Sequence, residues 1–206
     1  MSETYEGKAV RVTFEGARCI HSRNCVLALP EVFRPNVQGP WIDPDGAPAD
    51  AVLALASRCP SGAIRAERVD GTAPEAPSTR ATVQVQENGP YVLRGAFTLN
   101  GATELRATLC RCGKSNNKPY CDHSHVDGFV ATGECATRTP GEWPPGAGVE
   151  ITVAPDGPLL LAGPVEVIAG SGRTVDRGAK FALCRCGQSG TKPFCDGTHR
   201  KVGFVG

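Results

Sequence analysis

Residues 184–199 read CRCGQSGTKPFCDGTH, and residues 110–125 read CRCGKSNNKPYCDHSH. The two stretches share the spacing C-x-C-x8-C-x3-H at an offset of 74 residues. Upstream, VQENGP at 85–90 pairs with VAPDGP at 153–158 at an offset of 68 residues. A repeat at this scale indicates two copies of one structural unit, the second with six additional residues between its two conserved parts.

Each copy begins with alternating apolar residues interrupted by a two-residue turn, Asn88-Gly89 in the first copy and Asp156-Gly157 in the second. This is a strong short-range signal for a β-hairpin. The predicted strands are 81–87, 91–97, 149–154 and 159–168.

Three cysteines and one histidine in each copy supply four ligands, the number that one zinc ion or one [2Fe–2S] cluster requires. They are Cys110, Cys112, Cys121 and His125 in the first copy, and Cys184, Cys186, Cys195 and His199 in the second. Residues i and i+2 of an extended segment project to one side, and residues i and i+4 share one face of a helical turn. The spacing therefore predicts that the C-x-C pair binds one iron and the C-x3-H pair binds the other. Zinc is the alternative, but zinc sites more often show C-x2–4-C pairs.

Other residues of the motif have expected roles. Asp122 and Asp196 are predicted N-caps of a short helical turn, with its positive end toward an anionic cluster. Gly113 and Gly187 would let backbone N–H groups approach the cluster. Several cations near the ligands would moderate its charge, although most of them are also expected on a solvated face: Arg111, Lys114, Lys118, Arg185, Lys192, Arg200 and Lys201. Phe129 and Phe204 are expected to pack under the ligand loops, and Cys135, which matches no repeat position, is expected to be an unligated thiol.

The pattern resembles the CDGSH iron–sulfur family, whose motif reads C-x-C-x2-[ST]-x3-P-x-C-D-G-[SAT]-H. Residues 184–199 satisfy every position, and residues 110–125 satisfy all but one, where His123 replaces glycine. The resemblance covers roughly residues 81–206 and implies a [2Fe–2S] cluster bound by the three cysteines and the histidine of each motif. It also implies roles in electron transfer and cluster transfer, and a pseudo-two-fold pairing of the copies within a monomer. His123 is expected to be an exposed side chain; a rival ligand or a residue in a strained left-handed conformation are the alternatives.

The sequence CIHSRNC at residues 19–25, followed by Cys59-Pro60, resembles the divergent mono-cluster ferredoxin-like family. Single-cluster ferredoxins have three cysteines at two-residue intervals in such a stretch, and this chain has Ser22 at the middle position. Cys19, Cys25 and Cys59 would suit a [3Fe–4S] cluster. A [4Fe–4S] cluster would need Ser22, His21 or solvent as its fourth ligand, and a degenerate site that binds nothing is the alternative.

The N-terminal segment is predicted to be a small α+β domain, with strands at 9–14 and 63–69 and helices at 24–29 and 49–57. The whole chain is expected to be α+β and strand-rich. The predicted organisation is an N-terminal ferredoxin-like domain (1–70), a linker (71–80), the first CDGSH domain (81–135), a second linker (136–148) and the second CDGSH domain (149–206).

Composition limits the function classes. The chain has 206 residues with 25 glycines and 17 prolines, few aromatic residues, and a net charge of +1. A neutral chain of this kind indicates no nucleic-acid partner, and its longest apolar runs are too short to span a membrane. Ten cysteines without an apparent signal peptide favour metal ligation in a reducing, cytoplasmic compartment over disulfides.

No nucleophile elbow, phosphate loop or dinucleotide fingerprint is present, so we expect no enzyme. The sequence favours an electron carrier that exchanges electrons with redox partner proteins. The alternatives are a donor of clusters to apo iron–sulfur acceptors or a redox or pH sensor, and then a structural zinc protein.

Overall fold

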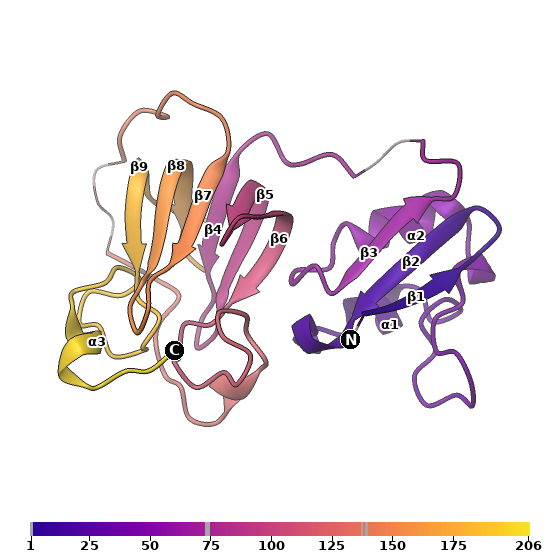
Figure 1. Ribbon diagram of the computed structural model, residues 1–206, viewed down its shortest axis with the longest axis horizontal. Coiled ribbons are helices and arrows are strands. Elements are labelled where there is room, and N and C mark those ends of the chain that lie inside the picture. Colours follow the sequence, from indigo (N-terminus) through magenta and orange to yellow (C-terminus); the bar gives the residue numbers. More distant parts are fainter. Residues whose placement is uncertain (1, 73–74, 137, 139) are drawn as a thin grey trace. The chain divides into compact units, whose positions relative to one another are not determined.

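The structure, a computed structural model, describes residues 2–72, 75–136, 138 and 140–206 (Figure 1). The chain divides into two compact units, residues 1–76 and residues 77–206, called here the N-terminal and C-terminal units. Both repeat copies lie in the C-terminal unit. Positions 73, 74, 137 and 139 of the two predicted linkers lie outside the described residues. In the part that is described, no helix is both long enough and apolar enough to cross a lipid bilayer.

The N-terminal unit is a three-stranded antiparallel sheet in the order β1-β2-β3, accompanied by short helices. Its elements are β1 (Ser2–Glu6), β2 (Val10–Glu15), η1 (Gly16–Arg18), α1 (Asn24–Ala28), η2 (Pro44–Gly46), α2 (Ala49–Ala56) and β3 (Ile64–Arg68). The predicted strands and helices of this segment are confirmed to within one or two residues. Strand β1 was not predicted, because its sequence SETYE is polar and four of its five residues are exposed.

The helix α2 packs on the sheet through its apolar face. Val52 and Leu55 are buried together with Val10 and Val12 of β2. The helix ends at Ala56, so the chain turns before Cys59-Pro60, where proline disfavours a continuing helix.

The C-terminal unit is built on a pseudo-two-fold relation between the two copies. The first copy contributes β4 (Ala81–Val85), β5 (Tyr91–Leu99), β6 (Ala102–Leu109) and η3 (Ser124–Val126), and the second contributes β7 (Val149–Val153), β8 (Leu159–Ile168), β9 (Thr174–Leu183) and α3 (Thr198–Lys201). Within each copy the three strands pair antiparallel. Between copies, β4 pairs parallel with β8 and β5 pairs parallel with β7. The two copies therefore share one six-stranded sheet and one hydrophobic core.

Two β-bulges allow β5 and β8 each to pair with a strand of its own copy and with a strand of the other copy. Register shifts lie between Arg94 and Phe97 in β5 and between Ala162 and Val165 in β8. Gly95 and Gly163 occupy these bulges with φ of 119° and 112°. A Cβ atom would lie 2.7 Å from the Cα of Ala81 at the first position and 2.3 Å from a backbone oxygen at the second. Only glycine permits this approach of the crossing strands.

The strands β6 and β9 were not predicted, because polar residues interrupt their alternation. In β6, Glu104, Arg106 and Thr108 are nevertheless buried. These two strands matter for function, because β6 ends one residue before Cys110 and β9 ends one residue before Cys184. Figure 1 shows the two following loops at the same end of the sheet.

Candidate iron–sulfur sites

Each ligand loop folds back onto the end of the strand that precedes it. In the first copy, the N–H of Cys110 donates to the carbonyl of Pro119 (2.8 Å), and the N–H of Cys121 donates to the carbonyl of Thr108 (2.9 Å). The second copy repeats both bonds at 2.8 Å, from Cys184 to Pro193 and from Cys195 to Ala182. The fold-back brings the third cysteine beside the first, although ten residues separate them in the sequence.

The predicted ligands form two contacting pairs in each copy. In the first, the sulfurs of Cys110 and Cys112 are 3.7 Å apart, and Cys121 Sγ lies 3.3 Å from His125 Nδ1. The second copy has the same distances, 3.7 Å between Cys184 and Cys186 and 3.3 Å from Cys195 to His199 Nδ1. The pairing predicted from the i,i+2 and i,i+4 spacing is therefore present in both copies.

Backbone N–H groups point at the cysteine sulfurs. The N–H of Lys114 lies 3.4 Å from Cys112 Sγ, and the N–H of His123 lies 3.4 Å from Cys121 Sγ. In the second copy the N–H of Gly197 lies 3.4 Å from Cys195 Sγ. Donors in these positions stabilise thiolates, which are the form that binds metal.

The thiols differ in how readily they ionise. The hydrogen bond from Cys112 lowers the pKa of the Cys110 thiol to about 6, and the same bond raises the pKa of Cys112. Burial raises the pKa of Cys121 to about 11. Metal binding at these sites must therefore displace protons from buried thiols, which makes it pH-dependent.

The N-cap of each helical turn lies one residue after the predicted position, Asp122 in the first copy and Asp196 in the second. The capping positions are occupied by His123 and Gly197, both in the left-handed conformation. The aspartates still accept the first N–H of the turn, from Ser124 (3.0 Å) and from Thr198 (2.9 Å). Burial alone would raise the pKa of Asp122, but hydrogen bonds from Ser124 and from the backbone of Asn116 lower it to about 2.

The prediction that His123 is an exposed side chain is wrong. The residue is half-buried, and its ring meets the ring of His125 edge-on at 4.9 Å. Its φ of 76° matches the 85° of Gly197, so His123 occupies the left-handed position that glycine fills in the second copy. This was one of the two alternatives drawn from the sequence.

The two ligand loops pack directly against each other. A Cβ atom at Gly113 would lie 2.7 Å from the carbonyl oxygen of Cys186, and one at Gly187 would lie 2.6 Å from that of Cys112. The motif glycines were predicted to admit N–H groups to the cluster. Their positions show a second role, because they allow backbone-to-backbone contact between the two sites.

The arginines between the paired cysteines are core residues. Arg111 is 1% exposed and donates to the carbonyls of Gln86, Gly89, Ala131 and Thr132 at 2.7–3.1 Å. In the second copy, Arg185 donates to the carbonyls of Ala154, Gly157 and Gly206 at 2.8–3.2 Å.

Their guanidinium groups lie 5.1 Å from the rings of Phe129 and Phe204, so both phenylalanines pack beside the ligand loops. The prediction that most cations near the ligands lie on a solvated face is therefore wrong for Arg111 and Arg185.

The arrangement fits a two-iron cluster. Within the described residues, no three Cys, His, Asp or Glu side chains are close enough to share one metal ion. Each site instead presents one Cys–Cys pair and one Cys–His pair, and the fold-back hydrogen bonds at Cys110 and Cys121 bring the two pairs together in the first copy. Two ligands per metal is the distribution that a [2Fe–2S] cluster needs.

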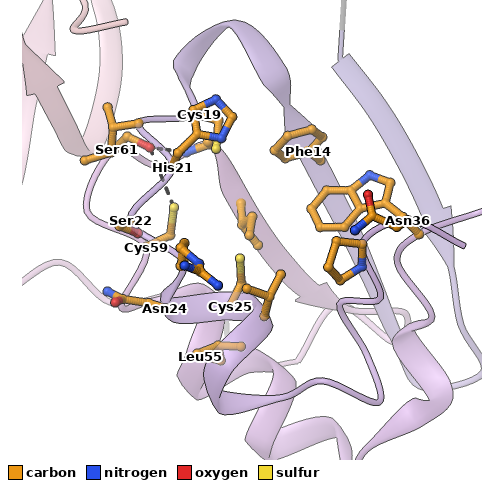
Figure 2. A pocket seen from close by; sticks show the side chains of 17 residues that line it. Phe14, Cys19, His21, Ser22, Asn24, Cys25, Asn36, Leu55, Cys59 and Ser61 are labelled. Atoms are coloured by element: carbon orange, nitrogen blue, oxygen red, sulfur yellow. Dashed lines mark hydrogen bonds between the residues drawn. The ribbon is translucent and has the colours of Figure 1, made fainter. Parts of the chain in front are cut away.

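The N-terminal unit holds a cavity of about 560 Å³. Cys19, Cys25 and Cys59 line it, and Figure 2 shows their sulfurs facing the same space. Burial raises the pKa of Cys19 and of Cys25. The hydroxyl oxygen of Ser61, a buried residue, lies 3.7 Å from Cys59 Sγ. Ser61 was not singled out from the sequence, because its contact with Cys59 depends on the turn after Cys59-Pro60.

The candidate fourth ligands His21 and Ser22 line the same cavity and are exposed (Figure 2). His21 and Arg23 have positive φ values of 52° and 63°, which is uncommon for residues other than glycine. Such strain is concentrated at functional sites. Three cysteines around one cavity fit a cubane-type cluster, in which each cysteine binds a different iron.

Cys135 is different from the ligand cysteines. Its sulfur is buried and donates to the carbonyl of Gly133 at 3.7 Å. Burial raises the pKa of this thiol. Cys135 packs in the hydrophobic core of the C-terminal unit, and the expectation that it is an unligated thiol stays a prediction.

Comparisons with known proteins agree with this geometry. Residues 88–126 and 156–200 match the family described as iron-binding zinc finger, CDGSH type, and residues 5–68 match the family described as divergent 4Fe-4S mono-cluster. The uncharacterized protein YjdI of Escherichia coli K12 is 38% identical over 61 residues, which cover 30% of this chain and 79% of YjdI. YjdI of Escherichia coli O157:H7 matches to the same extent. No solved structure matches significantly. The chain belongs to the CDGSH-type iron-binding family, with two units of that family joined to an N-terminal divergent 4Fe-4S mono-cluster domain.

Proposed function

We propose that this iron–sulfur protein is an electron carrier that holds one [2Fe–2S] cluster in each CDGSH motif and exchanges electrons with redox partner proteins. The observation that carries the proposal is the pair of identical four-ligand sites, each divided into a Cys–Cys and a Cys–His pair. A bound [2Fe–2S] cluster would supply reversible one-electron chemistry.

The residues of the chain would serve that chemistry in three ways. The cysteines and histidines bind the metals, and the backbone N–H groups of Lys114, His123 and Gly197 stabilise the thiolates. The buried Arg111 and Arg185 add positive charge close to both sites, since Arg111 acts on Cys184 and Arg185 on Cys110. Positive charge and N–H donors favour the reduced, more negative state.

The direct contact between the ligand loops at Gly113 and Gly187 supports electron exchange within the chain. Two sites that share a backbone contact give an electron two places to reside in one unit. A partner that approaches one loop would thus have access to both sites.

Carrier activity is tested by reversible reduction of the full-length protein. We expect dithionite to bleach the visible absorbance, and an oxidised redox protein to restore it without loss of iron. Failure to restore the absorbance, with iron appearing on an added apo-ferredoxin, would contradict the carrier role and support cluster donation.

Cluster donation or pH sensing is the second candidate, and the half-exposed histidines favour it. His125 and His199 are half-buried, whereas all of the predicted cysteine ligands of the two motifs except Cys195 are buried. Imidazole competes with protons near neutral pH, whereas thiolates bind iron more firmly. The same reduction experiment distinguishes the two functions, because only donation transfers iron to the acceptor.

We also propose that the N-terminal unit binds a third cluster through Cys19, Cys25 and Cys59. With three cysteines, low-temperature EPR of the oxidised full-length protein is expected to show a [3Fe–4S] signal. Ser22→Cys adds a thiol to the same cavity and is expected to convert the centre to a [4Fe–4S] form, which is EPR-silent until it is reduced.

Ser78→Cys is the matched control, because Ser78 is exposed and lies outside the cavity. It should leave the oxidised signal unchanged. A silent oxidised spectrum in the unaltered protein, with no iron beyond that of the two motifs, would show that this unit binds no cluster.

A further inference from the structure

The hydroxyl of Tyr91 joins the two copies at the base of the second site. Tyr91 belongs to β5 of the first copy and is fully buried. Its Oη lies 2.9 Å from the carbonyl oxygen of Cys184 and 3.0 Å from that of Pro193. Cys184 is a ligand residue, and Pro193 accepts the N–H bond that folds the loop back. The Tyr91 hydroxyl therefore contacts the second ligand loop at two places, at Cys184 and at Pro193.

The first ligand loop has no such support from the equivalent position. The 68-residue offset places Leu159 where the first copy has Tyr91, and Leu159 is also buried. The first loop keeps its own fold-back bond between Cys110 and Pro119. Leucine has no hydroxyl, so it cannot donate to these carbonyls.

A second, independent difference also disfavours the first site. The left-handed residue between the third cysteine and the histidine is His123 in the first copy and Gly197 in the second. A side chain costs free energy in that conformation, whereas glycine adopts it readily. The first site therefore carries backbone strain beside two of its ligands, Cys121 and His125.

We propose that the two clusters are retained unequally, with the second motif holding its cluster firmly and the first motif releasing its cluster first. The inference rests on the proposed function, because it requires a [2Fe–2S] cluster in each motif. One chain would then combine a permanent electron-carrying site with an exchangeable site. Solvent exposure alone predicts the reverse order, because Cys195 is half-buried whereas Cys121 is 3% exposed.

The test follows the loss of visible absorbance in mild acid with an iron chelator, in the full-length double variant Cys19→Ser/Cys59→Ser, which lacks two ligands of the proposed N-terminal cluster. We expect two phases of equal amplitude that differ in rate by about fivefold or more, the factor that one net hydrogen bond corresponds to. Tyr91→Phe removes only the hydroxyl and should accelerate the slow phase about fivefold without changing the fast one. His123→Gly should slow the fast phase and leave the slow one unchanged.

Tyr120→Phe is the matched control. The second motif already has Phe194 at this position, and the Tyr120 hydroxyl lies 3.5 Å from a carboxylate oxygen of Glu104 rather than at a ligand-loop carbonyl. Both phases should keep their rates in this variant. A change as large as that in Tyr91→Phe would show that loss of any tyrosine hydroxyl loosens the unit.

Three results would overturn the inference. They are a single phase in the Cys19→Ser/Cys59→Ser background, acceleration of the fast phase when Tyr91→Phe is added to it, and equal acceleration of both phases. If Tyr91→Phe fails to fold, an unchanged fast phase in His123→Gly would also contradict it. Purified protein that carries zinc, or less than a full complement of iron, would instead contradict the proposed function.

Discussion

Arg111→Leu is expected to lower the free energy of unfolding of the C-terminal unit by about 4 kcal/mol. The side chain is 1% exposed and donates to four backbone carbonyls of the first hairpin and of the segment after the ligands. Leucine fills part of the volume but removes all four of these hydrogen bonds, at roughly 1 kcal/mol each. The thermal unfolding midpoint, followed by circular dichroism, should fall by about 10–20 °C.

The control for this change is Lys180→Leu, which also removes a cation but at an exposed position of β9. It should alter the midpoint by no more than about 2 °C, as surface substitutions usually do. Arg111→Lys should recover only part of the loss, because one ammonium cannot reach all four carbonyls. Equal midpoints for Arg111→Leu and Lys180→Leu would show that the arginine does not connect the hairpin to the ligand loop.

His199→Cys is expected to lower the midpoint potential of the second site by on the order of 100 mV, since plant-type ferredoxins with four cysteines lie well below histidine-ligated Rieske centres. A thiolate adds negative charge where neutral imidazole had none. The change should also slow the loss of visible absorbance in acid, because a protonated imidazole cannot bind metal. Spectroelectrochemical titration at several pH values measures the first effect, and stopped-flow mixing into acid measures the second.

His123→Gly is the control for the potential, since it removes a neighbouring histidine that is not a ligand. The midpoint potentials of both sites should stay unchanged in this variant. If His199→Cys also left the potential and the acid lability unchanged, His199 would not be a ligand.

The pairing of the proposed ligands was predictable from the sequence because it depends on local spacing. The i,i+2 and i,i+4 relations predicted the Cys–Cys and Cys–His pairs, and the repeat predicted two copies of the site. The position of Asp122 was wrong by one residue, because the left-handed His123 intervenes between the aspartate and the turn. Such a conformation is set by the loop as a whole and not by the neighbouring residue types.

Features that depend on tertiary contacts between distant parts of the chain were not predictable. Strands β6 and β9 carry buried polar residues that break the alternation of a half-buried strand. Arg111 was expected to be one cation among several, and only the folded unit surrounds it with carbonyls. Tyr91 acts on a residue 93 positions away in the sequence. No local pattern records either role.

The central claim, that each CDGSH motif holds a [2Fe–2S] cluster, is tested most directly by metal and sulfide analysis of purified, reconstituted protein. In the full-length double variant Cys19→Ser/Cys59→Ser, in which two ligands of the N-terminal site are removed, we expect about four irons and four acid-labile sulfides per chain, with little zinc. Mössbauer spectra should then show two-iron centres only. About two zinc ions per chain without sulfide, or fewer than about three irons, would contradict the claim.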